Sequence, residues 1–377
     1  MTISVRTELS HSYSFDSSVD AIFKITLVAE KKAEATGFHH IIVIDTSTSM
    51  AGSKIELAKK GAEEYARRIP KGNKVSVVTF SDSVRTYPES DLAKVLPTIK
   101  AAGLTALYSA LQATFEIAKK TTGSGWILLL TDGEPTDVMK PELYSQLKVP
   151  SGYKIVEFGI GEDYKESILK ALADASGGTL YHITDAQNLP VLMQDSAVDQ
   201  VAGRNIKVEF SGSEVHVLNY RGPPVEINAL ETVARIWGQV HMPAGFKGDL
   251  MTLQISYNDS TDGGRKTIKV PVNVRVAKNN QEYQQSIRND LVSEFAYYRG
   301  LEDYYKQLSA GQLKEATRTM QQISANAEQT RRTDLIESTR KLSDTHEQTL
   351  KLGGKPENTK KLLKEAASET TKRTRDK

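Results

Sequence analysis

The sequence predicts an α/β domain with a doubly wound, mostly parallel sheet, inserted into an antiparallel β-sandwich and followed by a C-terminal helical region. Three observations predict this fold class. Between residues 37 and 200, short and fully apolar runs alternate with segments of helical periodicity. On both sides of that stretch, apolar and polar residues alternate as they do in half-buried strands. Beyond residue 280, apolar residues recur three to four positions apart.

The β-sandwich is expected to be discontinuous in the chain, built from residues 1–36 and 201–280. The two strands of the first part would be marginal alone, because an isolated hairpin is barely stable in water. One sandwich interrupted by an inserted domain is the simplest arrangement, since the ends of a domain usually lie close together. The predicted strands are TISVRTEL and AIFKITLVAE before the insertion, and NIKVEFS, EVHVLNY, TVARIWGQV, LMTLQISYN and KTIKVPVNVRVA after it.

The inserted α/β domain is expected to span residues 37–200. Its predicted strands are apolar throughout, so helices must cover both faces of the sheet that they form. These strands are HHIIVID, KVSVVTF, GWILLLTD and YKIVEFGIG, and the helical segments include SKIELAKKGAEEYARRI, ALYSALQATFEIAKK and YKESILKALADAS.

The C-terminal part is predicted to be a helical domain over residues 281–352, followed by a polar, basic tail over residues 353–377. The residues after about 368 are expected to be disordered. The apolar stripe of the helices carries four tyrosines, and we expect it to pack inside the molecule. An exposed stripe would instead be a groove-binding surface, and the protein would then act mainly as a scaffold. The four tyrosines are Tyr297, Tyr298, Tyr304 and Tyr305.

Composition limits the possible classes of function. The 377 residues carry a formal net charge of +2 and include no cysteine. A balanced charge gives no general attraction to nucleic acid, and the lack of cysteine excludes disulfides and thiolate sites. No apolar run approaches the roughly 18 residues that span a bilayer, and the N-terminus lacks the pattern of a secretory signal. We therefore expect a cytoplasmic protein without a membrane span.

Side chains with oxygen donors follow predicted strands at three places. Asp45, Ser47 and Ser49 come directly after HHIIVID, Thr105 lies on a glycine-bearing loop before a helix, and Asp132 ends GWILLLTD. Open α/β sheets bind ligands at the carboxyl ends of their strands, so these five side chains should meet at one edge. Oxygen donors with only two carboxylates suit Mg²⁺, with Mn²⁺ or Ca²⁺ as substitutes.

The remaining hydroxyls of the same loop are expected to have other roles. Thr46 and Thr48 occupy the alternate positions, so they should face away from an ion and shape the turn. A simpler interpretation of the loop is a helix cap, in which Ser49 or Ser53 caps the helix that follows.

This ordered set of residues resembles the metal-ion-dependent adhesion site of von Willebrand factor type A domains. All five ligand positions match, and the resemblance covers about residues 37–200. It implies that Ser47, Ser49 and one or both of Thr105 and Asp132 hold the ion directly, the others acting through water. One departure is the sequence AGLT, which has a single glycine where the family often has two. The five matching positions are Asp45, Ser47, Ser49, Thr105 and Asp132.

The resemblance implies a protein-binding module rather than an enzyme. A partner protein would complete the coordination of the ion with a Glu or Asp, and Glu134 and Asp137 would line the rim of the site. The family suggests a MoxR-type AAA+ ATPase, or another component of a regulatory complex inside the cell, as the partner. In its order of elements the chain is also similar to bacterial von Willebrand A proteins and to inter-alpha-trypsin-inhibitor heavy chains.

An enzyme is the alternative class of function. A haloacid-dehalogenase-like phosphatase would use Asp45 as its nucleophile, but it would need a second acid at position 47, where this chain has Ser47. The chain also lacks a Gly-x-x-x-x-Gly-Lys loop, so we expect no nucleotide hydrolysis. Asp259 and Asp262 lack the spacing of a calcium loop and predict a hairpin turn. Histidines without metal-ligand spacing are His39, His40, His182, His216 and His241.

Overall fold

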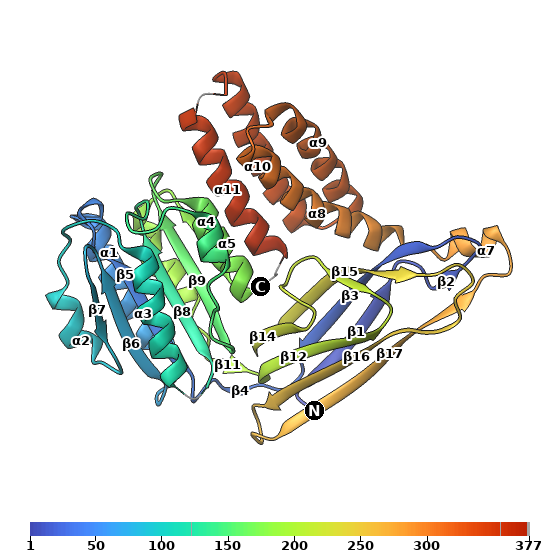
Figure 1. The fold of residues 1–377 in the computed structure, drawn as a ribbon, viewed down its shortest axis with the longest axis horizontal. Coiled ribbons are helices and arrows are strands. Elements are labelled where there is room, and N and C mark those ends of the chain that lie inside the picture. The colour runs from blue at the N-terminus through green and yellow to red at the C-terminus, as the bar shows by residue number, and fades with distance from the viewer. Residues whose placement is uncertain (122, 355, 375–377) are drawn as a thin grey trace.

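The computed structural model describes residues 1–121, 123–354 and 356–374, and it has three parts. Figure 1 shows the α/β domain and the β-sandwich side by side, with the C-terminal helices lying across both. The α/β domain is inserted in the sandwich, and antiparallel sheets and a helical region accompany its mostly parallel sheet. The predicted fold class is therefore confirmed.

The sheet of the α/β domain has the strand order β10-β9-β8-β5-β6-β7, and only the edge strand β7 is antiparallel to its neighbour. Four of the strands are the predicted apolar runs, and β5 lies at the centre between β8 and β6. The short strands β7 and β10 were not predicted, because neither is a continuous apolar run. The bounds are His39–Asp45 (β5), Lys74–Phe80 (β6), Val84–Tyr87 (β7), Gly125–Thr131 (β8), Tyr153–Ile160 (β9) and Thr179–Ile183 (β10).

Helices cover both faces of this sheet, as fully apolar strands require. Ile42 and Ile44 of β5 belong to a core shared with α1 and α6, whereas Ile41 and Val43 belong to a core shared with α3 and α5. The bounds are Ser53–Arg68 (α1), Leu92–Val95 (α2), Leu107–Lys120 (α3), Pro141–Ser145 (α4), Glu166–Ser176 (α5) and Leu189–Asp195 (α6).

The sandwich consists of a sheet of order β1-β3-β15-β13 facing a sheet of order β14-β12-β16-β17-β2. The antiparallel pair β4 and β11 brings the two ends of the inserted domain together, with Ala33 opposite Val201. The bounds are Ile3–Leu9 (β1), Tyr13–Ser14 (β2), Val19–Ala29 (β3), Ala33–Glu34 (β4), Gln200–Val201 (β11), Gly203–Gly212 (β12), Val215–Val217 (β13), Val225–Leu230 (β14), Val233–Met242 (β15), Gly248–Asp259 (β16) and Arg265–Val276 (β17).

From residue 289 on, the C-terminal helices pack against each other and against the other two parts. Their buried residues form one continuous core with α3 and α5 of the α/β domain and with Trp237 of the sandwich. The four tyrosines of the apolar stripe are all buried, so the stripe is not the exposed surface that the scaffold alternative requires. The bounds are Asn280–Gln285 (α7), Asn289–Ser309 (α8), Leu313–Thr330 (α9), Thr333–Lys351 (α10) and Pro356–Thr374 (α11).

The predicted tail is wrong for residues 356–374, which form the helix α11. This helix buries Leu362, Ala366 and Ala367 and packs against both β10 and α8. The Ser368 hydroxyl donates to the carbonyl of Leu180 and accepts from a backbone amide of β10. The polar composition suggested disorder, but the polar groups satisfy the open backbone of an edge strand. The predicted disorder at residues 375–377 lies outside the described residues.

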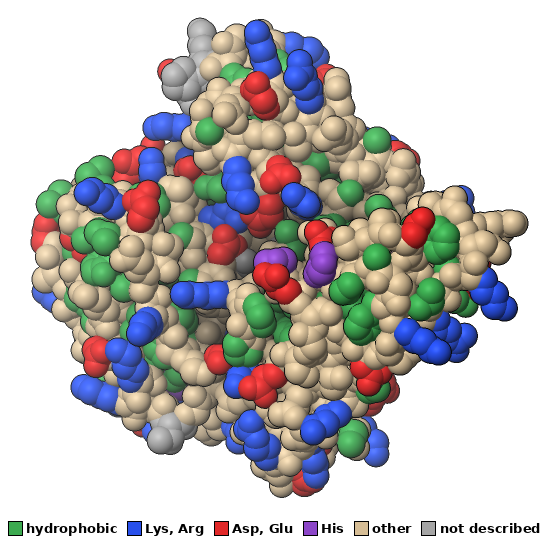
Figure 2. Space-filling view, turned by 45° about the vertical axis from the view of Figure 1, so that its right-hand side comes forward, with side chains coloured by type: hydrophobic (Ala, Val, Ile, Leu, Met, Phe, Trp, Pro, Cys, Tyr) green, Lys and Arg blue, Asp and Glu red, His purple; other side chains and the backbone are tan. Residues whose placement is uncertain are grey.

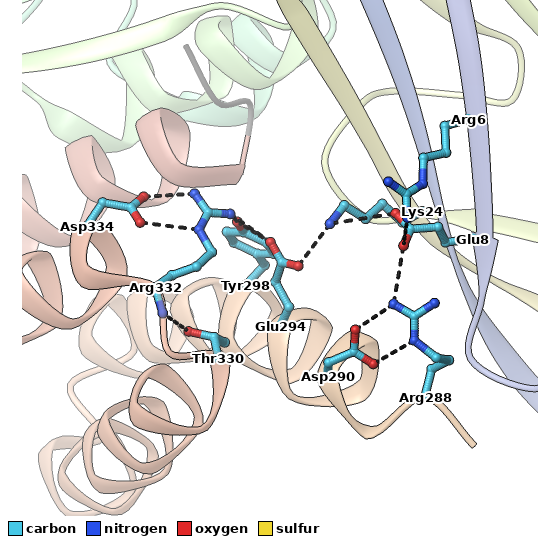
Figure 3. A network of polar contacts seen from close by, with 10 residues as sticks. All are labelled: Arg6, Glu8, Lys24, Arg288, Asp290, Glu294, Tyr298, Thr330, Arg332 and Asp334. Carbon is cyan, nitrogen blue, oxygen red and sulfur yellow. Dashed lines mark hydrogen bonds and ion pairs between the residues drawn. The ribbon is translucent and has the colours of Figure 1, made fainter. Parts of the chain in front are cut away.

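A network of ion pairs joins the sandwich to the helices (Figure 3). Glu294 of α8 accepts from Lys24 of β3 at 3.1 Å and from Arg332, before α10, at 2.7 Å. The Lys24 ammonium also lies 4.9 Å from the ring centroid of Trp237. Removing the buried Glu294 carboxylate would leave two cations without this partner, so the network ties the two parts together.

On the face shown in Figure 2, acidic and basic side chains are interspersed, in keeping with the formal net charge of +2. In the described part of the chain, no helix is long and apolar enough to cross a membrane.

Two adjacent buried histidines lie in the central strand β5. His39 lies between the Tyr153 hydroxyl and Ser76 Oγ, at 3.1 and 2.8 Å. His40 Nε2 lies 3.2 Å from the side-chain amide nitrogen of Asn73, so Nε2 accepts a hydrogen bond from that group and the ring is neutral. Burial lowers the pKa of His39 to about 4 and the pKa of His40 to about 3.

Acid is therefore expected to destabilise the fold through His40. The unfolded chain takes up a proton near pH 6.5 whereas the folded chain does not, so this stabilising contribution is present above pH 6.5 and is lost on acidification toward the folded pKa of about 3. The stability difference between wild type and His40→Phe, measured by urea unfolding, should shrink by about 2 kcal/mol between pH 7.5 and pH 5. His216→Phe, at an exposed histidine, is the control. A difference for His40→Phe that does not change with pH would contradict this prediction.

Candidate metal centre

The register of the central strands brings two of the three loops together. β5 pairs in parallel with β6 and with β8, and Ile44 lies opposite Leu130. The chain therefore leaves both β5 and β8 at the same edge, with Asp45 beside Thr131 and Asp132 one residue beyond. This edge is where an open α/β sheet places its ligands.

Asp45 is fully buried and is held by two hydrogen bonds. Its carboxylate accepts from the amide of Ser47 at 2.8 Å and from the hydroxyl of Thr131 at 2.5 Å. Burial raises the pKa of Asp45 to about 6, although these hydrogen bonds lower it. The carboxylate is thus fixed in direction, and a nearby cation would stabilise its ionised form.

The two serines of the loop and Asp132 form a chain of short contacts. Ser47 Oγ lies 3.0 Å from Ser49 Oγ, and the Ser49 hydroxyl donates to Asp132 Oδ1 at 2.7 Å. Asp132 and Ser47 are buried whereas Ser49, which lies between them, is exposed, so the chain of oxygens reaches the surface at Ser49. A ligand in solution can reach the chain at that point.

Thr105 reaches the same point from the third loop. A Cβ atom at Gly133 would lie 3.2 Å from Thr105 Oγ1 and 3.6 Å from Ser49 Oγ, so both hydroxyls border the backbone that follows Asp132. The amide of Thr105 donates to Thr136 Oγ1 at 3.1 Å, and the amide of Thr136 donates to the carbonyl of Thr105 at 2.8 Å. These two hydrogen bonds hold the two loops together. The structure therefore brings together all five predicted ligand residues.

The other hydroxyls of the first loop turn away, and their predicted role in shaping the turn is confirmed. Thr46 Oγ1 donates to the carbonyl of Phe80 at 2.9 Å, and Thr48 Oγ1 donates to the carbonyl of Gly103 at 3.1 Å. Gly103 has a φ of 87°, so the single glycine of AGLT stands where the loop needs one. The helix-cap interpretation is wrong, because α1 begins at Ser53 after Gly52 and has no side-chain cap.

Lys54 is a residue of this site that the sequence reasoning missed. Its ammonium donates to Asp132 Oδ2 at 2.5 Å, while Ser49 occupies Oδ1 of the same carboxylate. Lys54 belongs to the first turn of α1, where a positive charge is unfavourable because the amide dipoles of a helix already make that end positive. A lysine at this helix position was the signal in the sequence that could have pointed to a nearby carboxylate.

The two predicted rim residues differ in their surroundings. Glu134 is exposed. Asp137 is exposed but engaged, since its carboxylate accepts from the amides of Tyr108 and Ser109 at the start of α3, at 3.3 and 2.9 Å. Leu104, directly before Thr105, is an apolar side chain with 58% of its surface exposed. The surface around the site thus offers an apolar contact as well as charges.

The turn at Asp259 is held within the sandwich, as predicted for a hairpin. Asp259 accepts from the amide and hydroxyl of Thr261 at 2.9 and 2.7 Å and from the hydroxyl of Thr2 at 2.9 Å. These bonds occupy the carboxylate, which leaves the turn a structural role.

The donor atoms at the edge of the sheet fit a hard divalent cation. They are two carboxylates and three hydroxyls, and such oxygens are the ligands of Mg²⁺, Mn²⁺ and Ca²⁺. Among the residues that the structure describes, no three His, Asp or Glu side chains are grouped so that they could hold a metal ion. An ion at this edge would therefore need the hydroxyls as ligands, because the carboxylates of the chain alone would not complete its coordination.

Comparison with known families gives two matches. The model of the von Willebrand factor type A domain matches residues 41–195, and the model of the archaellum regulatory network B C-terminal domain matches residues 289–376. The second range comprises α8 to α11, including the helix that was predicted as a tail.

Solved structures and curated proteins resemble different extents of the chain. The ArnB paralog VWA2 from Sulfolobus acidocaldarius is 28% identical over 99% of both chains, with a TM-score of 0.83. A von Willebrand factor type A protein from Catenulispora acidiphila is 18% identical over 90% of this chain and 89% of the other, with a TM-score of 0.72, and shares the fold. Mouse inter alpha-trypsin inhibitor heavy chain 4 is 24% identical over 54% of this chain, and an uncharacterized Synechocystis protein is 28% identical over 38%. The chain spans 26% and 36% of the lengths of these two relatives.

Proposed function

Because the chain contains a von Willebrand factor type A domain, we propose that it is a metal-dependent protein-binding component of a regulatory complex. Asp45, Ser47, Ser49, Thr105 and Asp132 would hold a divalent cation, with Mg²⁺ as the ion in the cell and Mn²⁺ or Ca²⁺ as substitutes. A bound ion would supply an electrophilic position that accepts a carboxylate from the partner protein.

The observation that carries this proposal is the meeting of three loops at one edge. Ser47 and Ser49 contact each other, Ser49 contacts Asp132, and Thr105 borders the same backbone. The chain provides few negative charges for an ion, so a carboxylate from outside would complete its coordination. The exposed Leu104 beside Thr105 favours a partner whose acidic residue has an apolar neighbour.

The companion domain supports a regulatory role. The helices α8 to α11 match the C-terminal domain of archaellum regulatory network B, and they pack on both the α/β domain and the sandwich. A MoxR-type AAA+ ATPase or another regulatory component is the partner that we propose.

The test is affinity capture of partners from a lysate of the source cells, with Mg²⁺ or with EDTA, followed by mass spectrometry. We expect a partner that is retained in Mg²⁺ and released by EDTA, because the carboxylate contact needs the ion. Addition of excess Mg²⁺ after EDTA should restore retention, which controls for loss of the fold. Partners that bind equally in both buffers would argue against metal-dependent binding.

A further inference from the structure

Lys54 adds a positive charge to the candidate metal centre, beside the five oxygen donors. Its ammonium lies 2.5 Å from Asp132 Oδ2, and its side chain remains 31% exposed while that of Asp132 is fully buried. Asp132 uses its second oxygen to accept from Ser49. The lysine is therefore a cation at the end of the hydrogen-bond chain that links Ser47, Ser49 and Asp132.

The position of Lys54 in α1 indicates that its contact with Asp132 is the reason for a lysine there. The first turn of α1 disfavours a positive charge, and the last turn of the same helix holds Arg67 and Arg68, where positive charges are favoured. An ion pair with a buried carboxylate offsets the unfavourable helix position.

The sum of charges shows what the lysine changes. The ionised Asp45 and Asp132 with Lys54 carry one net negative charge, so a bound divalent cation would leave one net positive charge. Without Lys54 the same two carboxylates would neutralise the ion completely. A site with one net positive charge still attracts an anion, whereas a neutral site does so less.

We infer that Lys54 tunes the site for an anionic partner: it weakens the binding of the ion and strengthens the binding of a carboxylate to the ion-loaded site. This inference rests on the proposed function. It assigns Lys54 a positioning and charge-setting role without making it a ligand, because its ammonium has no lone pair to offer a metal.

The test measures the binding of Mn²⁺ and of a simple carboxylate in the same protein. Free Mn²⁺ is followed by electron paramagnetic resonance, and acetate serves as the probe for the partner carboxylate, with a correction for Mn²⁺ that acetate binds in solution. Lys54→Met removes the charge and keeps an unbranched side chain. Lys54→Arg keeps the charge, and Lys60→Met makes the same change at an exposed lysine of α1.

We expect Lys54→Met to bind Mn²⁺ about tenfold more tightly than wild type, since one repulsive charge is removed. Acetate should tighten the binding of Mn²⁺ to wild type and to Lys54→Arg, and this gain should be largely lost in Lys54→Met. Lys60→Met should behave as wild type. The two effects of Lys54→Met thus have opposite signs, which a loss of structure would not produce.

Two results would overturn the inference in distinguishable ways. If wild type binds Mn²⁺ while Lys54→Met binds it equally or more weakly and keeps the acetate gain, Lys54 only holds Asp132 in place and the metal site stands. If neither wild type nor Lys54→Met binds Mn²⁺, the proposed function and the role of Lys54 both fall. Thermal unfolding of each variant in EDTA verifies that the protein is folded.

Discussion

Deletion of residues 356–377 is expected to lower the melting temperature by about 10 °C or more and to cause aggregation. The deletion removes α11, whose Leu362, Ala366 and Ala367 are buried against the rest of the core. It also uncovers β10, an edge strand of the six-stranded sheet. The amide of Leu180 would lose the Thr371 hydroxyl that accepts from it at 3.0 Å, and the Leu180 carbonyl would lose Ser368. An uncovered edge strand can pair with another chain.

A point substitution tests the same packing without shortening the chain. Leu362→Ala should cost about 3 kcal/mol in the free energy of unfolding, because it leaves a cavity at a fully buried position. Leu350→Ala removes the same atoms from a leucine that is 41% exposed on α10 and should cost less than about 1 kcal/mol. Chemical denaturation measures both values, and size-exclusion chromatography reports aggregation of the deleted form. A truncated protein that stays monomeric with an unchanged melting temperature would mean that these residues behave as the tail that their composition suggests.

The sequence pattern predicted the centre of the α/β sheet well for a physical reason. Strands covered on both faces are apolar at most positions, so the centres of β5 and β8 stand out as apolar runs. The edge strand β10, with the sequence TLYHI, is covered partly by hydroxyls of α11 and therefore needs no such run. The same contact explains why α11 was not predicted. A helix that offers Ser368 and Thr371 to the backbone of a strand lacks a broad apolar stripe.

The residues of the candidate site that directly follow a strand could be predicted from the sequence. Asp45 and Asp132 each follow an apolar run, and parallel strands must end at one edge. Lys54 was not predictable in this way, because its partner is 78 residues away and only the path from β5 into α1 places it there. The capping of α3 by Asp137 was missed for the same reason, since it depends on how the loop after β8 folds back.

Asp45→Asn is expected to reduce the affinity for Mn²⁺ by about 100-fold or more, since changes to residues that only support metal ligands already cost up to roughly that factor. Asparagine has nearly the same shape and can still accept from the amide of Ser47, whereas its amide nitrogen cannot accept from the Thr131 hydroxyl, so the change removes the charge and one hydrogen bond. Capture of a partner in Mg²⁺ should fall to the level seen in EDTA. Asp16→Asn makes the same change at an exposed residue of the sandwich and should leave both measurements at the wild-type values.

The stability of the metal-free protein should change in the opposite direction. Burial raises the pKa of Asp45 from 3.8 to about 6, so at pH 7 its ionised carboxylate destabilises the folded state relative to the unfolded state. Asparagine removes that cost, and in EDTA Asp45→Asn should be more stable than wild type by about 1 to 3 kcal/mol. Retained Mn²⁺ affinity in a folded Asp45→Asn protein would remove this carboxylate from the metal site. Lower stability together with lost binding would assign Asp45 to the fold. Higher stability together with lost binding would show that the charge of Asp45 serves metal binding. A buried carboxylate that destabilises the metal-free protein is then explained by the cation that it binds.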